Sequence, residues 1–201
     1  MTGRADVVVR EEGVIAGLPG AEMALHLVDS RLRWLAEKED GQSVKRGDRV
    51  ACVEGPARSM LTAERPMLNL LGRLSGVATL TKRYVDAVAG TKARIYDTRK
   101  TLPGWRLLEK YAVRCGGGHN HRLGLYDGIL IKDNHIAGLG KNFPIKLRRV
   151  IADAQKLKGI KFIAVEVDHV DHQLNHVLKI PGIDIVLLDN MGQWQLKHAV
   201  E

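Results

Sequence analysis

Two chemically opposed groups of side chains stand out in this 201-residue sequence. The basic group consists of Arg65, Arg99, Lys100, His121, Arg122 and Lys132. Arginine guanidinium groups pair with carboxylate or phosphate oxygens through two parallel hydrogen bonds. The acidic group, Glu166 and Asp189, could hold a divalent metal that bridges phosphates, or stabilise positive charge that develops in a transition state. Together the two groups predict a pocket for a small polyanion.

The elements that must position these side chains are four short apolar segments in the second half of the chain. We expect strands at residues 94–96, 128–131, 162–165 and 183–188, and helices at residues 105–114, 145–157, 170–180 and 193–200. Strands that alternate with helices predict a parallel sheet with right-handed crossovers. The strands are almost wholly apolar, which is typical of a sheet covered on both faces.

Each of the four expected strands is followed by charged or polar residues. These lie at residues 97–100, 132–135, 166–168 and 189–190. Charged residues often follow strands simply because loops are exposed. In a βα barrel, however, the carboxyl ends of all strands meet at one face, and the active site lies there. Four charged ends out of four therefore predict that the two groups converge on one site.

The first part of the chain reads as short strands joined by turns. A helix is expected at residues 21–28, and the sequence "KRGDR" at residues 45–49 predicts a turn between strands. A longer helical pattern covers residues 59–89, where Thr62 could cap the first turn. Gly72 and Gly76 weaken this helix, so a bend or break is expected near them.

Composition narrows the classes of function. The formal charge of +8 points to an anionic partner. Aromatic residues are scarce and no Lys/Arg block exists, which disfavours a nucleic-acid partner. No apolar run approaches the roughly 20 residues that a membrane helix needs, and the start lacks the pattern of a secretory signal. We therefore expect a soluble, cytoplasmic protein with no membrane partner.

Cysteine, histidine and glycine patterns are not diagnostic by themselves. Cys52 and Cys115 are far apart, which disfavours a disulfide framework or a zinc knuckle. His169, His172 and His176 share a helical face, but no carboxylate stands where a metalloprotease helix carries its glutamate, so we interpret them as surface residues. The glycine-rich stretch "CGGGHNHRLGL" matches neither a Walker loop nor a dinucleotide fingerprint.

Taken in order, five strings resemble one enzyme family. They are "AERPMLNLLGRLSGVAT", "DTRKTLPGWR", "YAVRCGGGHNHRLGLYDGILIKDNHI", "VEVD" and "IVLLDN". Together they resemble the nicotinate-nucleotide pyrophosphorylases, also called quinolinate phosphoribosyltransferases. The resemblance runs from about residue 7 to the end and is dense between residues 64 and 136.

The resemblance implies a reaction and roles for the residues. Such enzymes convert quinolinate and phosphoribosyl pyrophosphate to nicotinate mononucleotide, pyrophosphate and CO2 in de novo NAD biosynthesis, with Mg²⁺. Arg99, His121, Arg122 and Lys132 would hold the quinolinate carboxylates. Lys100 would meet phosphoribosyl pyrophosphate, and Glu166 and Asp189 would bind ribose and metal and stabilise the oxocarbenium-like carbon. Arg65 would reach into the pocket of the neighbouring subunit, since family members are dimers with shared sites.

The resemblance also implies a fold, and this sequence departs from the family's usual pattern in three places. An N-terminal α/β sandwich domain, residues 1–76, would precede an incomplete α/β barrel, residues 77–201. The usual Ala-Glu-Arg-Thr is "AERP" here, with Pro66 after Arg65. The sequence starts after the family's first helical segment and stops before its phosphate-binding loops, so we expect a chain truncated at both ends.

Two other hypotheses remain open at this stage. The chain could be a catalytically impaired paralog that acts as a binding module. It could also be a related transferase for another heteroaromatic acid, of the type associated with molybdenum transport. Turnover and a panel of substrates would separate these hypotheses from the enzyme.

Overall fold

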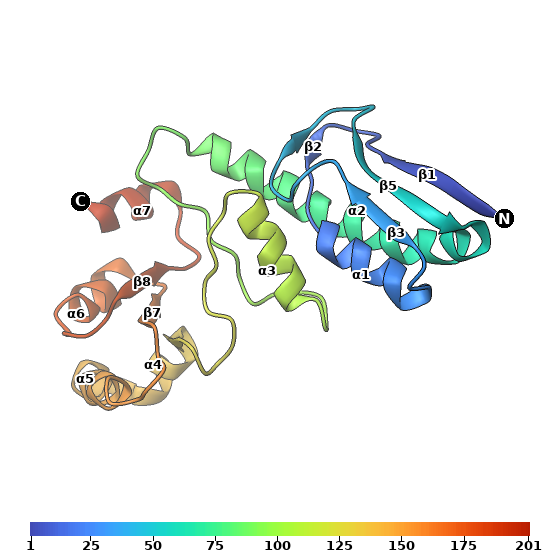
Figure 1. The fold of residues 1–201 in the computed structure, drawn as a ribbon. Coiled ribbons are helices and arrows are strands. Elements are labelled where there is room, and N and C mark those ends of the chain that lie inside the picture. Colours follow the sequence, from blue (N-terminus) through green and yellow to red (C-terminus); the bar gives the residue numbers. More distant parts are fainter. The chain divides into compact units, whose positions relative to one another are not determined.

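The computed structural model describes residues 1–201 and divides them into two compact units, Met1–His121 and Arg122–Glu201. Both units are mixed α/β (Figure 1). None of the helices combines the length and the apolar character needed to cross a bilayer.

The first unit is built on an antiparallel sheet. Its strands lie in the order β1-β5-β3, with β1 at Thr2–Val8, β5 at Arg49–Pro56 and β3 at Arg33–Ala36. Two short strands, β2 at Gly13–Val14 and β4 at Ser43–Val44, form a separate pair. The predicted turn before β5 is confirmed, because Asp48 N donates to Lys45 O at 3.0 Å and Gly47 has a φ of 93°.

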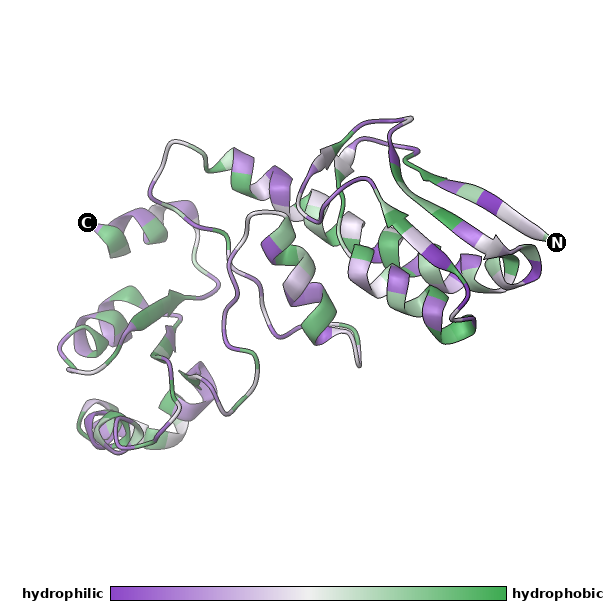
Figure 2. Cartoon of the chain, in the orientation of Figure 1, coloured by the Kyte–Doolittle hydropathy of each residue, from purple (hydrophilic) through white to green (hydrophobic).

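Helices α1, at Leu18–Val28, and α2, at Ala57–Ala87, pack against this sheet (Figure 1). The apolar residues of α2 recur at helical spacing and form one buried face: Ala63, Met67, Leu71, Leu74 and Ala78. Leu25 and Leu32 are among the largest wholly buried side chains in the same core. Figure 2 shows hydrophilic and hydrophobic residues alternating along both helices, as expected for helices with one face in the core. Helix α3, at Arg106–Cys115, completes the unit.

Helix α2 confirms the long predicted helix but corrects two of its details. Thr62 does not cap the first turn, because its hydroxyl donates to Arg58 O inside the helix at 3.0 Å. The helix also runs through Gly72 and Gly76 without a break. The predicted domain boundary at residue 76 falls within this helix and stays a prediction.

The second unit contains the parallel sheet that the sequence predicts. Its strands lie in the order β6-β7-β8, at Ile129–Ile131, Ile163–Val167 and Ile185–Leu188, and both pairs are parallel. The remaining elements are α4 at Asp133–Leu139, η1 at Gly140–Asn142, α5 at Phe143–Ala154, η2 at Val170–Leu174, α6 at Asn175–Val177 and α7 at Gln193–Val200.

Three predicted elements differ from the structure. Residues 94–96 do not form a strand of the parallel sheet; Tyr96 makes only an isolated bridge to His119, within the first unit. Residues 170–180 form a π-helical turn and the short α6 instead of one helix. The polar residues after β6 are the start of α4, which the sequence pattern did not reveal.

The core of the second unit lies on one face of its sheet. Ile163, Val165 and Val167 of β7 are buried in it with Leu147 and Ile151 of α5. The residues of β6 and β8 that join this cluster are Ile129, Ile131, Val186 and Leu188. Side chains alternate between faces along a strand, so the intervening residues point to the opposite face.

Candidate active site

Three of the predicted site residues lie where the strands of the second unit end. Lys132 directly follows β6, Glu166 is the penultimate residue of β7, and Asp189 directly follows β8. The strand register pairs Ile131 with Val165, so Lys132 comes beside Glu166. Asp189 N donates to Val167 O at 2.9 Å, which continues the hydrogen bonding between β7 and β8 one residue beyond β8.

All three side chains belong to the face of the sheet opposite the hydrophobic cluster. Glu166 alternates with the clustered Val165 and Val167, and Lys132 and Asp189 follow the clustered Ile131 and Leu188. Lys132 Nζ lies 3.9 Å from Glu166 Oε2, and the two side chains are 49% and 14% exposed. This face therefore presents one cation and two carboxylates at the carboxyl edge of a parallel sheet.

Asp189 is held by its neighbour Asn190. Asn190 adopts the left-handed conformation, with a φ of 53°, and it is the one non-glycine residue with positive φ. Its side-chain nitrogen donates to Asp189 Oδ2 at 2.9 Å. The backbone thus turns sharply where the strand ends and leaves the Asp189 carboxylate exposed.

Asp168 is a candidate that sequence reasoning passed over. It lies two residues after Glu166, so it belongs to the same face, and its Oδ1 is buried without a hydrogen-bond partner. Its backbone N–H donates to Gln173 Oε1 at 2.9 Å. The alternation of acidic and apolar residues in "VEVD" was the signal that could have found it.

Arg122 is set in a tight loop at the start of the second unit. Its side chain donates through Nη1 to Gly128 O at 3.0 Å, and the residue is only 9% exposed. Asp127 closes the loop by accepting hydrogen bonds from Leu123 N and Gly124 N at 3.0 and 2.8 Å. These backbone hydrogen bonds, and to a smaller extent the ammonium group of Lys161, lower the pKa of Asp127 to about 2.

The other four predicted residues lie in the first unit. Lys100 and Arg65 are exposed, Arg65 on α2, and Arg99 and His121 are half-buried. Arg99 Nε is buried and has no partner within the protein. Because a buried donor without an acceptor is costly, an anionic ligand is a natural partner for it. Convergence of all eight residues on one site stays a prediction, since the two units are described separately.

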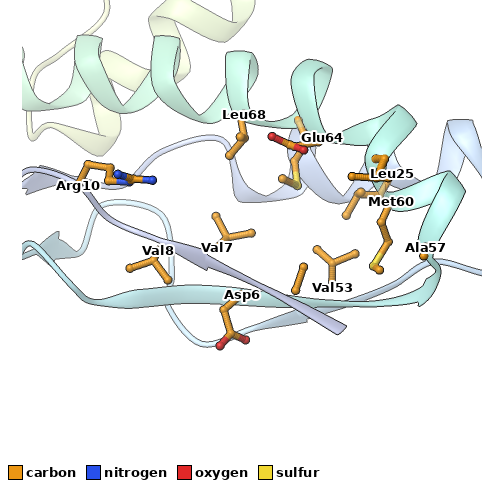
Figure 3. Close-up of a pocket in the computed structure, with 13 residues that line it drawn as sticks. Asp6, Val7, Val8, Arg10, Leu25, Val53, Ala57, Met60, Glu64 and Leu68 are labelled. Carbon is orange, nitrogen blue, oxygen red and sulfur yellow. The ribbon is translucent and has the colours of Figure 1, made fainter. Parts of the chain in front are cut away.

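One apolar cavity in the first unit is lined by none of these residues. It has a volume of about 590 Å³ and lies between β1 and α2, where Val7, Val53, Met60 and Leu68 line it (Figure 3). Glu64, the neighbour of Arg65, borders it. Its apolar lining is unsuited to a small polyanion.

Comparison with known families covers every residue of the chain except residue 76. The model of the quinolinate phosphoribosyl transferase N-terminal domain matches residues 1–75, and that of the C-terminal domain matches residues 77–201. The chain belongs to the quinolinate phosphoribosyltransferase family. The resemblance read from the five sequence strings is thereby confirmed, as is the combination of an N-terminal sheet domain with a C-terminal α/β domain.

Individual relatives agree with this membership. The chain is 49% identical over 197 residues to the nicotinate-nucleotide pyrophosphorylase [carboxylating] of Mycobacterium leprae, which is 97% of this chain and 67% of that protein. It is 40% identical over 195 residues to a probable enzyme of the same name from Bacillus subtilis, 96% of this chain and 65% of that protein. The chain thus spans about two thirds of the length of these family members.

Solved structures of family members have the same fold. The structure of NadC from Streptococcus pyogenes superimposes with a TM-score of 0.88 at 38% identity, over 99% of this chain and 68% of that one. The nicotinate-nucleotide pyrophosphorylase from Francisella tularensis gives a TM-score of 0.89 at 38% identity, over 100% of this chain and 68% of that one.

Proposed function

We propose that this protein is a quinolinate phosphoribosyltransferase. It would join quinolinate to phosphoribosyl pyrophosphate, release pyrophosphate and CO2, and form nicotinate mononucleotide. The pyridine nitrogen attacks the anomeric carbon of the ribose, and the bond to pyrophosphate breaks. The 2-carboxylate then leaves as CO2, and the electron pair left on C2 of the ring takes up a proton from solvent. Family membership supports this reaction, because the curated relatives carry its name.

The observation that carries the proposal is the pairing of Lys132 with Glu166. The cation and the carboxylate stand on adjacent parallel strands, 3.9 Å apart, and Asp189 follows the third strand on the same face. A diacid needs cations, and a ribose carbon that becomes positively charged needs carboxylates. This face offers both within one row of strands.

The roles follow from the chemistry of each side chain. Arg99, His121, Arg122 and Lys132 would bind the two carboxylates of quinolinate, and Lys100 would bind the phosphates of the co-substrate. Glu166 and Asp189 would stabilise the positive charge on the anomeric carbon, an effect that is often the largest single contribution to catalysis. Correct alignment of nitrogen and carbon supplies much of the remaining rate, so the protein needs no nucleophile of its own.

The donor set suits Mg²⁺ held mainly by the substrate. Mg²⁺ prefers oxygen ligands and is usually bound by one or two carboxylates together with phosphates. Glu166 and Asp189 supply such carboxylates, and no cluster of three or more potential ligands exists in the chain. When bound, the ion would neutralise the charge of the departing pyrophosphate.

Arg65 bears on the oligomeric state of the enzyme. We propose a cytoplasmic homodimer in which Arg65 of one subunit completes the site of the other. The exposed position of Arg65 on α2, without an ion-pair partner in its own chain, supports a role outside its own subunit. We propose no nucleic-acid or membrane partner.

A turnover assay tests the function. Purified protein is supplied with quinolinate, phosphoribosyl pyrophosphate and Mg²⁺, and nicotinate mononucleotide is measured by chromatography. Product that depends on both substrates supports the proposal. Quinolinate binding without turnover would instead identify a binding module, and preference for another heteroaromatic acid would identify a related transferase. Either result would overturn the proposed reaction.

A further inference from the structure

A buried ion pair in the first unit contacts the backbone of His121 from two sides. Lys110 on α3 and Asp97 are in direct contact, and their side chains are 3% and 7% exposed. Asp97 Oδ1 accepts a hydrogen bond from His121 N at 2.8 Å, and Lys110 Nζ donates to His121 O at 3.3 Å. One ion pair therefore occupies both backbone polar groups of one residue.

The surrounding hydrogen bonds make this arrangement a closed unit. His119 N donates to Ile95 O at 2.8 Å, and Asp97 N donates to His119 O at 3.0 Å, so two distant segments are joined as a short parallel bridge. The side-chain nitrogen of Asn120, in its favoured orientation, donates to Asp97 Oδ2 and to Lys110 O, both at 3.0 Å. Every polar group of the pair thus finds a partner, which is the condition under which buried charges are tolerated.

A merely stabilising contact would not need this arrangement. Two well-packed apolar residues often replace a buried ion pair without loss of stability, so such a pair is weak evidence for a stabilising role. What apolar residues cannot do is bind a peptide N–H and a peptide carbonyl in fixed directions. The pair is also placed where position matters, because Asp97 precedes Arg99 by two residues and Lys110 holds His121.

We propose that Lys110 and Asp97 are positioning residues that fix the backbone of His121, and so aim its imidazole at a carboxylate of the substrate. This inference rests on the proposed function for the identity of the substrate. The two hydrogen bonds that Asp97 and Lys110 form with the His121 backbone, called the His121 clamp below, are a property of the free protein. Neither residue touches the substrate in this account; both act through His121.

The test is a double-mutant cycle on quinolinate affinity. Lys110→Met removes the donor to His121 O and keeps an unbranched side chain that is one atom shorter. We expect the dissociation constant of quinolinate to rise by about tenfold or more, with kcat changed by less than about threefold, since a carboxylate contact of this kind serves ground state and transition state alike. In a His121→Ala background the same substitution should have no further effect, because the residue it positions is already gone.

Two additional variants separate a loss of positioning from misfolding and from the mere loss of a lysine. Lys110→Met with Asp97→Asn leaves no buried charge and keeps an acceptor for His121 N, so it should fold and still show the loss of affinity. Lys82→Met removes an exposed lysine that pairs with Asp86 on α2, and it should leave affinity unchanged. Equal effects of Lys110→Met with and without His121, or a loss of stability with unchanged affinity, would overturn the inference.

A measurement on the free protein separates this inference from the function. Hydrogen exchange should show a protected His121 amide in the wild type and faster exchange, by about tenfold or more, in a Lys110→Met, Asp97→Leu protein, which buries no charge and offers that amide no acceptor. If the amide loses protection in this variant but the wild-type protein binds no quinolinate, the proposed function is wrong and the His121 clamp is still supported. If the His121 amide is unprotected in the wild type, the His121 clamp does not exist, whatever the protein binds.

Discussion

Lys132 and Glu166 lie side by side at the ends of two parallel strands, with Lys132 Nζ 3.9 Å from Glu166 Oε2. Such a partly exposed pair at this distance adds little to stability, since exposed ion pairs are worth about 0–1 kcal/mol. It lies at the carboxyl edge of the sheet, which is where βα folds carry their active sites. We therefore interpret Lys132 and Glu166 as members of the proposed catalytic site.

Glu166→Gln should abolish most of the activity and preserve the fold. The amide keeps the shape of the side chain but cannot stabilise a positively charged ribose carbon, so kcat should fall by about 100-fold or more, which is about 3 kcal/mol. Steady-state kinetics measure the loss, and urea unfolding checks the fold. Glu39→Gln, an exposed position in the first unit, is the matched control and should retain full activity. A kcat within about threefold of the wild type would exclude the proposed role.

Arg122→Ala should remove most of the affinity for quinolinate. Deletion of one partner from a buried arginine–carboxylate contact costs about 2–5 kcal/mol. Calorimetric titration with quinolinate measures this loss. Arg122→Lys retains the charge without the planar fork and should show an intermediate affinity. An unchanged affinity in Arg122→Ala would show that the assignment of this residue is wrong.

Asp127 should make the stability of the second unit depend on pH. Its folded-state pKa of about 2 lies below the ordinary value of 3.8, so its contribution is present above pH about 4 and is lost as pH falls toward 2. The shift corresponds to about 2 kcal/mol. Asp127→Asn should therefore unfold at lower urea than the wild type at pH 7, and this gap should shrink at pH 3. A gap independent of pH would exclude the charge of Asp127 as its cause.

Two glycine substitutions should act in opposite directions. A Cβ at Gly128 would lie 3.1 Å from Arg122 Cβ and 2.9 Å from the ring of Phe162, so Gly128→Ala should destabilise the protein by about 1–3 kcal/mol and weaken quinolinate binding. Gly72 on α2 has open space at the same position, so Gly72→Ala should stabilise by up to about 1 kcal/mol. Urea unfolding of both variants makes the comparison. Equal changes in the free energy of unfolding would show that the space around Gly128 accommodates a Cβ without strain.

Subunit complementation tests the proposed place of Arg65. If Arg65 completes the site of the partner subunit, Arg65→Ala and Glu166→Gln proteins should each be inactive alone. Mixed after unfolding and refolding, they should regain up to about a quarter of wild-type activity, because half of the dimers are hybrids with one intact site. No recovery in a mixture shown to contain hybrids would place Arg65 in its own subunit's site, and full activity of Arg65→Ala alone would place it outside any site.

The sequence predicted what depends on local patterns and missed what depends on distant partners. The parallel strands β6, β7 and β8 were predicted because each is a short apolar run bounded by polar residues, although the hydrophobic cluster covers one face of the sheet and not both. Helix α1 begins three residues earlier than expected because Asp40 accepts hydrogen bonds from Gly17 N and Leu18 N, a cap supplied from 22 and 23 residues away. No local window contains that information.

The misassigned strand at residues 94–96 has a similar cause. Ile95 and Asp97 bond to His119 instead of to the parallel sheet, and the apolar run before "DTRK" looks the same in either case. The basic and acidic groups of the candidate site were visible in the sequence by type and spacing. Asp127, Asp97 and Lys110, which bind backbone groups of or next to the candidate residues Arg122 and His121, were not, because such a role is evident only from the backbone groups that a side chain binds.

The most direct test of the central claim follows the carbon that the reaction must release. Quinolinate labelled with carbon-14 in its 2-carboxylate is incubated with the wild-type protein, phosphoribosyl pyrophosphate and Mg²⁺, and labelled CO2 is collected. We predict one CO2 for each nicotinate mononucleotide formed, and a loss of both signals together in Glu166→Gln. Labelled CO2 released without phosphoribosyl pyrophosphate, or undiminished in Glu166→Gln, would contradict the account.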